Sequence, residues 1–188
     1  MRIVFKKYIW AAKTIFRRLY FGHIGKFSYI GKPIGIIGAK NIYLGNRVRI
    51  QPGCRIETHN AGKIYIEDNV SIGQNFHCTA GGNLVIGSNC TVLGNTFITD
   101  IDHDYRQIGV HILDQPQIVK ETKIGENCFI GYGAAIQAGT ILGKQCVVGA
   151  NAVVRGKYPD FCVIVGAPGR IVKKYNMQTG EWERVDHE

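Results

Sequence analysis

An aliphatic residue returns at every sixth position along much of this chain. An α-helix would repeat near 3.6 residues and an alternating strand at 2, so neither regular element explains the spacing. A short strand followed by a corner does explain it, because three such sides make one triangular coil of about 18 residues. The longest unbroken run consists of Ile124, Ile130, Ile136, Leu142, Val148 and Val154. The sequence therefore predicts an all-β parallel β-helix.

Earlier parts of the chain keep the same period in blocks of three. The blocks are Leu44, Ile50 and Ile56; Ile66, Ile72 and Cys78; and Ile86, Val92 and Ile98. A second register, four residues after each aliphatic one, is mostly small, as expected where side chains crowd inside a narrow tube. Cysteines occupy much of this register, and a free cysteine behaves as a small hydrophobe. We therefore expect the cysteines to be free thiols that fill the interior.

Three interruptions of the period predict where extra chain is inserted between repeats. Residues 57–65 and 79–85 each add a few positions between blocks. The third interruption is larger, because 26 positions separate Ile98 from Ile124 where one coil needs about 18. A solenoid tolerates a loop extruded at a corner, and such loops commonly line the binding face. We expect the extruded loop, about residues 99–123, to carry functional side chains.

The amino-terminal segment differs from the repeats in both pattern and charge. Residues 2–21 have the periodicity of an amphipathic helix, and no Asp or Glu precedes Glu57 although twelve Lys and Arg do. One side carries Val4, Phe5, Tyr8, Ala12, Ile15, Phe16 and Leu19, and the other carries Arg2, Lys6, Lys13 and Arg17. Such a helix either lies on an anionic membrane surface or packs its apolar side onto the coils or a neighbouring subunit. The sequence leaves both alternatives open.

These patterns divide the chain into three parts: a basic amphipathic helix over residues 1–25, a β-helix over 26–168, and a carboxy-terminal cap over 169–188.

No export signal is apparent, and no uncharged run in the amino-terminal segment approaches the ~18 residues needed to cross a bilayer. We expect a cytoplasmic protein, with the inner face of the membrane as an alternative place. The basic segment lacks the pattern of a nucleic-acid-binding module, so no nucleic-acid partner is expected.

Two long blocks and a closing motif carry a resemblance to a known family. They are IGSNCTVLGNTFITDIDH, TKIGENCFIGYGAAIQAGTILGKQCVVGANAVV and VIVGAPGRIVKK, within residues 64–174. They resemble the hexapeptide-repeat acyltransferases, and within them the maltose and galactoside O-acetyltransferase-like group that includes enzymes decorating bacterial surface polysaccharides. The resemblance implies a left-handed coil and a homotrimer with active sites between neighbours. It also implies acetyl-CoA as co-substrate and no metal.

The same resemblance assigns His103, at the start of the extruded loop, as the general base. A neutral imidazole with a pKa of about 6.5 can take the proton of a hydroxyl as that hydroxyl attacks a thioester. Asp102 and Asp104 are the nearest candidates for orienting the ring. The sequence departs from the galactoside-type enzymes in an early coil, where an asparagine of those enzymes touches the acceptor; the corresponding place here is near Thr79, with a shorter insertion. The expected reaction is acetyl transfer to a sugar hydroxyl of a surface polysaccharide or of its lipid-linked precursor.

Coenzyme A is expected to lie along the carboxy-terminal coils. The residues that match the family's contact positions are Phe129, Gly131, Tyr132, Gly149, Ala150, Arg155, Arg170 and Lys173. The two glycines suit a purely structural role at corners equally well, and Arg170 and Lys173 equally suit a solvated tail.

Other functions remain open for the same fold. An antibiotic or an amino sugar could replace the sugar hydroxyl as acceptor. A non-catalytic scaffold is a further alternative, although His103 and the intact closing motif argue against it. A γ-type carbonic anhydrase would need three histidines on zinc. The spacing of His77, His103 and His111 does not match that pattern, so no metal site is expected.

Overall fold

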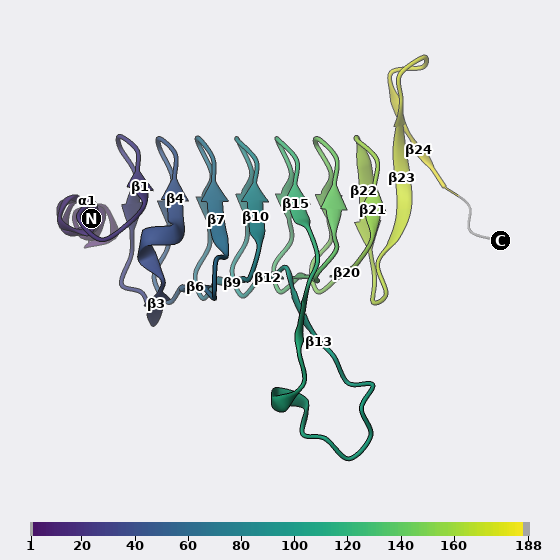
Figure 1. The fold of residues 1–188 in the computed structure, drawn as a ribbon. Helices are drawn as coiled ribbons and strands as arrows, with labels where there is room; N and C mark the ends of the chain where they lie inside the picture. The colour runs from purple at the N-terminus through teal and green to yellow at the C-terminus, as the bar shows by residue number, and fades with distance from the viewer. Residues whose placement is uncertain (1, 186–188) are drawn as a thin grey trace.

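The six-residue period corresponds to three parallel sheets wound around one interior. A computed structural model describes residues 2–185 and shows flat coils stacked along one axis, with a helix at one end and a hairpin hanging from the middle (Figure 1). The first sheet is β1 (His23–Ile24), β4 (Ile42–Leu44), β7 (Lys63–Ile66), β10 (Asn83–Ile86), β15 (Thr122–Ile124), β18 (Ile141–Leu142) and β21 (Lys157–Tyr158). The predicted parallel β-helix is therefore confirmed.

Two further sheets complete the triangular section. The second is β2 (Tyr29–Ile30), β5 (Arg49–Ile50), β8 (Ser71–Ile72), β11 (Thr91–Val92), β16 (Phe129–Ile130), β19 (Val147–Val148) and β22 (Cys162–Val165), extended by β23 (Arg170–Asn176) and β24 (Glu181–Arg184). The third is β3 (Gly35–Ile37), β6 (Arg55–Thr58), β9 (His77–Ala80), β12 (Phe97–Thr99), β17 (Ala135–Ile136) and β20 (Val153–Val154). The coils begin at β1, one coil before the first regular block of repeats, and the left hand implied by the resemblance stays a prediction.

The interior is filled by the ladders that the period predicted. In the third sheet Ile56 pairs with Cys78, and Ile98 pairs with Ile136. These side chains are fully buried, and all six cysteines are buried free thiols. In the last coils the Sγ atoms of Cys146 and Cys162 are 3.5 Å apart. Stacking of like side chains thus provides one continuous hydrophobic core.

Asparagine holds many of the tight corners. Asn69, Asn75, Asn89 and Asn95 have φ between 57° and 61°, a left-handed conformation in which asparagine is enriched. Their amides also stack, because Nδ2 of Asn69 donates to Oδ1 of Asn89 at 2.9 Å and Nδ2 of Asn75 donates to Oδ1 of Asn95 at 3.0 Å.

The smaller interruptions of the period stay within the coils. Residues 57–65 and 79–85 lengthen the coils that contain them. Arg55 therefore pairs with His77, 22 positions further along the chain, whereas Ala135 in a regular coil pairs with Val153, 18 positions further along. Of the three interruptions, only the extruded loop, residues 99–123, leaves the stack (Figure 1). It contains the hairpin of β13 (Ile101–His103) and β14 (Gln117–Val119) and a short 3-10 turn, η2 (Ile112–Asp114). A second such turn, η1 (Ala39–Asn41), precedes β4.

The helix α1 (Arg2–Arg17) covers the open end of the first coil through a polar stripe. The hydroxyl of Thr14 accepts the backbone N–H of Ile30 at 3.0 Å, Nη1 of Arg17 donates to the carbonyl of Ile30 at 2.8 Å, and the ring of Trp10 lies 6.0 Å from that of Tyr29. Because α1 ends at Arg17, the predicted helix over residues 2–21 is four residues too long. At the other end, β23 and β24 form an antiparallel hairpin in the predicted cap. No helix in residues 2–185 has the length and hydropathy needed to span a bilayer.

The described residues on the predicted apolar side of the amino-terminal segment are largely exposed. Tyr8, Ile15, Phe16 and Leu19 are between 61% and 80% exposed. Of the alternatives for this side, packing onto the chain's own coils is therefore wrong for these residues. The side chains of Arg2, Val4 and Phe5 lie outside the described part of the structure.

Candidate active site

The root of the extruded loop is fixed by two buried polar side chains. The carboxylate of Asp100 accepts the backbone N–H groups of Gly81 at 2.7 Å and Gly82 at 2.9 Å. Burial raises the pKa of Asp100, and these two hydrogen bonds oppose the rise. The hydroxyl of Thr122 donates to the carbonyl of Thr99 at 3.1 Å and accepts the N–H of Gly139 at 3.1 Å. The points where the chain leaves and re-enters the stack are therefore held together.

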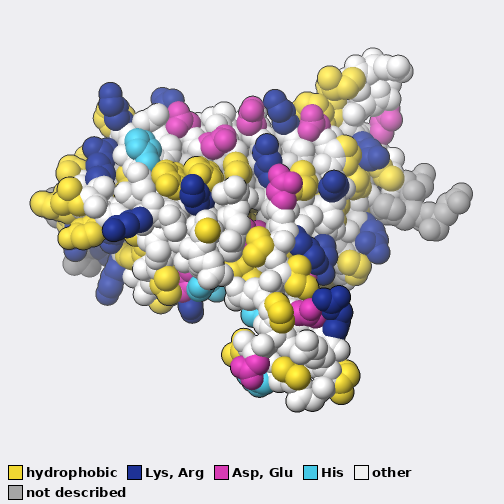
Figure 2. All heavy atoms as spheres, in the orientation of Figure 1, with side chains coloured by type: hydrophobic (Ala, Val, Ile, Leu, Met, Phe, Trp, Pro, Cys, Tyr) yellow, Lys and Arg dark blue, Asp and Glu magenta, His cyan; other side chains and the backbone are white. Residues whose placement is uncertain are grey.

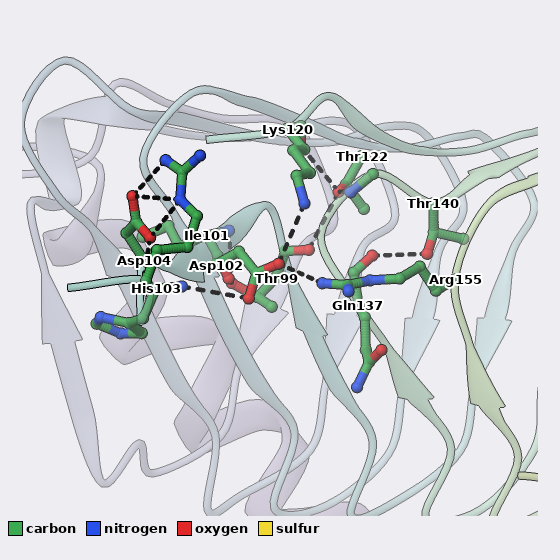
Figure 3. A network of polar contacts seen from close by, with 12 residues as sticks. Thr99, Ile101, Asp102, His103, Asp104, Lys120, Thr122, Gln137, Thr140 and Arg155 are labelled. Atoms are coloured by element: carbon green, nitrogen blue, oxygen red, sulfur yellow. Dashed lines mark hydrogen bonds and ion pairs between the residues drawn. The ribbon is translucent and has the colours of Figure 1, made fainter. Parts of the chain in front are cut away.

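Asp102 is held between two cations on the hairpin and the neighbouring coils. Its Oδ2 accepts Nζ of Lys120 at 3.2 Å and Nη2 of Arg155 (Figure 3). Partial desolvation raises the pKa of Asp102, but the hydrogen bonds from Lys120 and Arg155 outweigh it and lower the pKa overall. This carboxylate therefore ties the loop to the coil that follows β20.

His103 ends β13 with an exposed side chain opposite Gln117. Neither neighbouring aspartate binds its ring. Oδ1 of Asp102 accepts the backbone N–H of His103 at 3.2 Å, and Asp104 pairs with Arg106 at 2.5 Å. The hydrogen bonds from Arg106 lower the pKa of Asp104 to about 2. Both carboxylates thus fix the loop backbone in this structure, rather than orienting the imidazole as expected from the sequence.

A groove of about 560 Å³ joins the loop to the outer face of the third sheet. Asp102, His103, Gln137 and Arg155 line it on the side of the loop. The other side is lined by residues of β6, β9 and β12, among them the predicted acceptor residue Thr79. The Oγ1 of Thr79 lies 3.2 Å from Nε2 of His77.

Glu57 forms a polar cluster with three basic residues at the β6 side of the groove. Its side chain is only 6% exposed, and Oε1 accepts Nε of Arg55 at 2.7 Å. Its Oε2 lies 3.8 Å from Nε2 of His59 and 4.0 Å from Nε2 of His77. Burial, and then the charge of Arg55, lower the pKa of His77, whereas Glu57 opposes the change. His77 is therefore predominantly neutral near pH 7.

Sequence reasoning missed the role of Glu57. The residue lies in an interruption of the period, and no motif marks it. An acid that directly follows the inward-facing Ile56 was nevertheless a usable signal. Within residues 2–185, no group of three or more His, Cys, Asp or Glu is arranged to hold a metal ion.

Of the predicted coenzyme A residues, one lies in the groove and the others lie on the second sheet or at its corners. Arg155 lies in the groove beside Asp102, whereas Phe129 and Tyr132 are exposed on the second sheet and its following corner, outside the groove. Arg170 and Lys173 lie on β23, and Gly149 and Ala150 follow β19.

Gly131 has a clear structural role at its corner. A Cβ there would lie 2.5 Å from the backbone nitrogen of Ala150 and 2.6 Å from the carbonyl carbon of Gly149. The next coil therefore excludes any larger residue, whether or not coenzyme A also passes here.

Comparisons with known proteins agree with this fold. Residues 121–155 match the family model described as the hexapeptide repeat of succinyl-transferase. The chain is 32% identical over 153 residues to the putative lipopolysaccharide biosynthesis O-acetyl transferase WbbJ of Escherichia coli K12, covering 77% of this chain and 78% of that protein. The chain belongs to the hexapeptide-repeat acyltransferases. The expected family and the expected class of enzyme, an acetyltransferase, are thereby confirmed.

Two further relatives extend the comparison. This acyltransferase is 30% identical over 158 residues to a probable acetyltransferase of Mycobacterium tuberculosis, where the match covers 82% of this chain but only 51% of that protein. Its fold resembles that of AntD, an N-acyltransferase from Bacillus cereus solved with dTDP and 3-hydroxybutyryl-CoA, with a TM-score of 0.74 and 20% identity over 89% of this chain and 90% of that one.

Proposed function

We propose that this acyltransferase moves an acetyl group from acetyl-CoA to a sugar hydroxyl, with His103 as the general base. The observation that carries the proposal is the position of His103. Its exposed side chain lines the groove from a hairpin whose root is held by buried hydrogen bonds of Asp100 and Thr122. A base fixed in this way can meet a bound hydroxyl without first ordering a loop.

The proposed reaction needs no covalent acyl-enzyme. The imidazole of His103 takes the hydroxyl proton as the hydroxyl oxygen attacks the thioester carbonyl carbon. The C–S bond then breaks, and the imidazolium returns the proton to the leaving thiolate. The products are an acetyl ester and the free thiol of coenzyme A, so protons and electrons balance.

A thiol-release assay with acetyl-CoA and a panel of glycans tests the base directly. His103→Ala is expected to lower turnover by about a hundredfold or more, the usual scale for a positioned base. His111→Ala is a matched control, because His111 is exposed on the same loop but does not line the groove. Equal turnover of His103→Ala and the wild-type enzyme would refute the mechanism.

The nature of the acceptor is part of the proposal. The name of WbbJ supports a surface polysaccharide or its lipid-linked precursor as the acceptor. AntD is instead an N-acyltransferase, and a variant of it was solved with dTDP-4-amino-4,6-dideoxyglucose, so an amino sugar is the second candidate. Product mass gives the acetyl increment, and alkaline hydroxylamine removes an O-acetyl ester but leaves an amide, so the two outcomes are distinguishable.

A homotrimer is the proposed assembly, with sites formed between neighbouring chains. The separation of the predicted coenzyme A residues supports it, because Phe129 and Tyr132 lie outside the groove that holds His103. Light scattering after size-exclusion chromatography should give about three times the 20.9 kDa chain mass. A monomer in that experiment would contradict the proposal.

Peripheral attachment to the cytoplasmic face of an anionic membrane is the proposed role of α1. Apolar and basic side chains gather at the end of the solenoid that carries this helix (Figure 2). Lys6, Lys7 and Lys13 are exposed together with Phe16 and Leu19, the combination that suits a helix lying in a lipid headgroup region. Co-sedimentation with phosphatidylserine vesicles should fall in the double variant Phe16→Glu, Leu19→Glu. It should persist in Met177→Glu, which alters an exposed residue at the opposite end.

A further inference from the structure

We infer that the groove binds an acceptor of at least two sugar units, with a recognition subsite for the second unit built around Glu57. This inference rests on the proposed function, because it concerns the acceptor of the same groove. It concerns Arg55, Glu57, His59, His77 and Phe97, which lie on the outer face of β6, β9 and β12 and in the corner after β6.

The unsatisfied oxygen of Glu57 is the first observation. Oε1 is bound by Arg55, but Oε2 has no hydrogen bond to any described residue. No fully buried side-chain oxygen or nitrogen in residues 2–185 lacks a hydrogen-bond partner, so this oxygen must open to the groove that Glu57 lines. A carboxylate that is 6% exposed and has one free oxygen facing a cavity is prepared for a ligand that donates a hydrogen bond.

An imidazole beside this oxygen fits a hydroxyl group. Nε2 of His59 and Nε2 of His77 are 3.8 and 4.0 Å from Oε2, too far for direct hydrogen bonds. Nε2 of His77 already has a hydrogen-bond partner in Oγ1 of Thr79, at 3.2 Å, which leaves Nε2 of His59 for a ligand. A hydroxyl placed between Oε2 and Nε2 of His59 can donate to the carboxylate and hydrogen-bond to the imidazole.

An aromatic surface adjoins these polar groups. The ring of Phe97 packs against that of His77 at a centroid distance of 5.1 Å and an angle of 55°, and both residues line the groove. Apolar ring faces beside a few converging polar groups are the usual composition of a small-molecule site. A pyranose presents C–H groups on its faces and hydroxyls at its edge, so it matches both parts.

The spacing of the strands sets the length of the acceptor. Glu57 lies on β6, and the hairpin with His103 leaves the stack from the end of β12, two strands further along the sheet. Two strand spacings are about 9.6 Å, since parallel strands lie about 4.8 Å apart. One sugar unit of a glycan extends over about one such spacing, so the two strands are separated by about the length of two units. The acetylated unit therefore lies by His103 and a neighbouring unit by Glu57.

A glycan-binding experiment tests this subsite without relying on catalysis. The background is His103→Ala, which removes the proposed base, and the probe is an array of disaccharides and the methyl glycosides of their component sugars. Glu57→Gln in this background should lose at least one class of disaccharide while leaving the methyl glycosides unchanged. Identical array profiles with and without Glu57→Gln would overturn the inference. Loss of acetyl transfer by His103→Ala alone tests the proposed function separately.

Kinetics provide the second readout if a glycan in the panel is acetylated. Glu57→Gln should raise KM for a disaccharide acceptor by about tenfold or more, the scale of a lost hydrogen bond to a charged group. The kcat and the KM for acetyl-CoA should change by less than about twofold. An equal rise in KM for the methyl glycoside, or a loss confined to kcat, would contradict a subsite for a second sugar.

Two further variants guard against a folding artefact. Glu57 is buried, so thermal unfolding of Glu57→Gln is measured beside Glu181→Gln, the same change on exposed β24 at the far end of the chain. His59→Ala alters a partly exposed side chain of the cluster and should raise the disaccharide KM by about fivefold, the scale of a neutral hydrogen bond. If the disaccharide KM is unchanged in both single variants, His59→Ala and Glu57→Gln, the inference is also overturned.

Discussion

Replacing Thr122 with valine should loosen the catalytic loop without leaving a cavity. The substitution keeps the shape of the side chain but removes the hydroxyl that bonds to Thr99 and Gly139 across the root of the loop. Thr122 is fully buried, so a carbonyl and an N–H lose their partner away from water. Each unsatisfied group costs about 1–3 kcal/mol, and we expect a total loss of about 3 kcal/mol in the free energy of unfolding.

Thermal unfolding measures this loss. For a chain of this size, about 3 kcal/mol corresponds to a fall in Tm of about 6–12 °C. Ser28→Ala is the matched control, because the hydroxyl of Ser28 also donates to a carbonyl, that of Gly45, and accepts an N–H, that of Val48. Ser28 is buried in the first coil, between β1 and β2, three coils before β12, the strand from which the extruded loop leaves.

The two variants should lower stability alike and differ in function. Thr122→Val should speed hydrogen exchange in β13 and β14 and lower kcat by about ten- to a hundredfold, because small misplacements of catalytic groups are costly. Ser28→Ala should leave both unchanged at a temperature where it is folded. If the hairpin exchanges equally slowly in both variants, or if kcat falls equally, the hydroxyl of Thr122 does not hold the loop.

Three further outcomes follow from the contacts. Gly131→Ala should lower the free energy of unfolding, measured with denaturant, by about 1–3 kcal/mol, because its Cβ would lie 2.5 Å from the backbone of the next coil. Near-native stability would mean that this corner can move. The six thiols should react with an aromatic disulfide reagent only on unfolding, since all are buried and burial raises the pKa of Cys54 to about 11; rapid reaction in the folded protein would contradict the ladder. The Asp104–Arg106 pair should support the loop above about pH 4 and be lost as the pH falls through about 2, because the folded pKa lies below the unfolded one; a carboxyl NMR titration midpoint near 4 would refute it.

The repeats could be predicted from the sequence because each six-residue unit is local. The strand and its corner need only an inward aliphatic residue, a small partner and a compact turn, so Ile124 to Val154 predicted their own places in the core. The same count located the extruded loop, since a missing repeat must be replaced by chain that leaves the stack. His103 followed from the resemblance, and the structure places it in the groove.

The structure also corrected expectations that depended on distant parts of the chain. Asp102 contacts Arg155, 53 residues away, because stacking places the end of β20 beside the hairpin. Arg155, which is expected to contact coenzyme A, also lines the groove. The helix packs through Trp10, Thr14 and Arg17 rather than through its apolar side, since the carbonyl and N–H of Ile30 at the open coil need polar partners.

The sequence by itself determined the period, the buried ladders and the position of the one large loop. These features are set by short-range spacing, which is written directly in the order of residues. Only the tertiary structure decided what the groove contains. Glu57, His77 and His103 belong to different coils or to the loop, and they line one cavity because coil lengths set which residues of successive turns lie side by side. Insertions of four residues between β6 and β7 and of two between β9 and β10 change that alignment without changing the repeat itself.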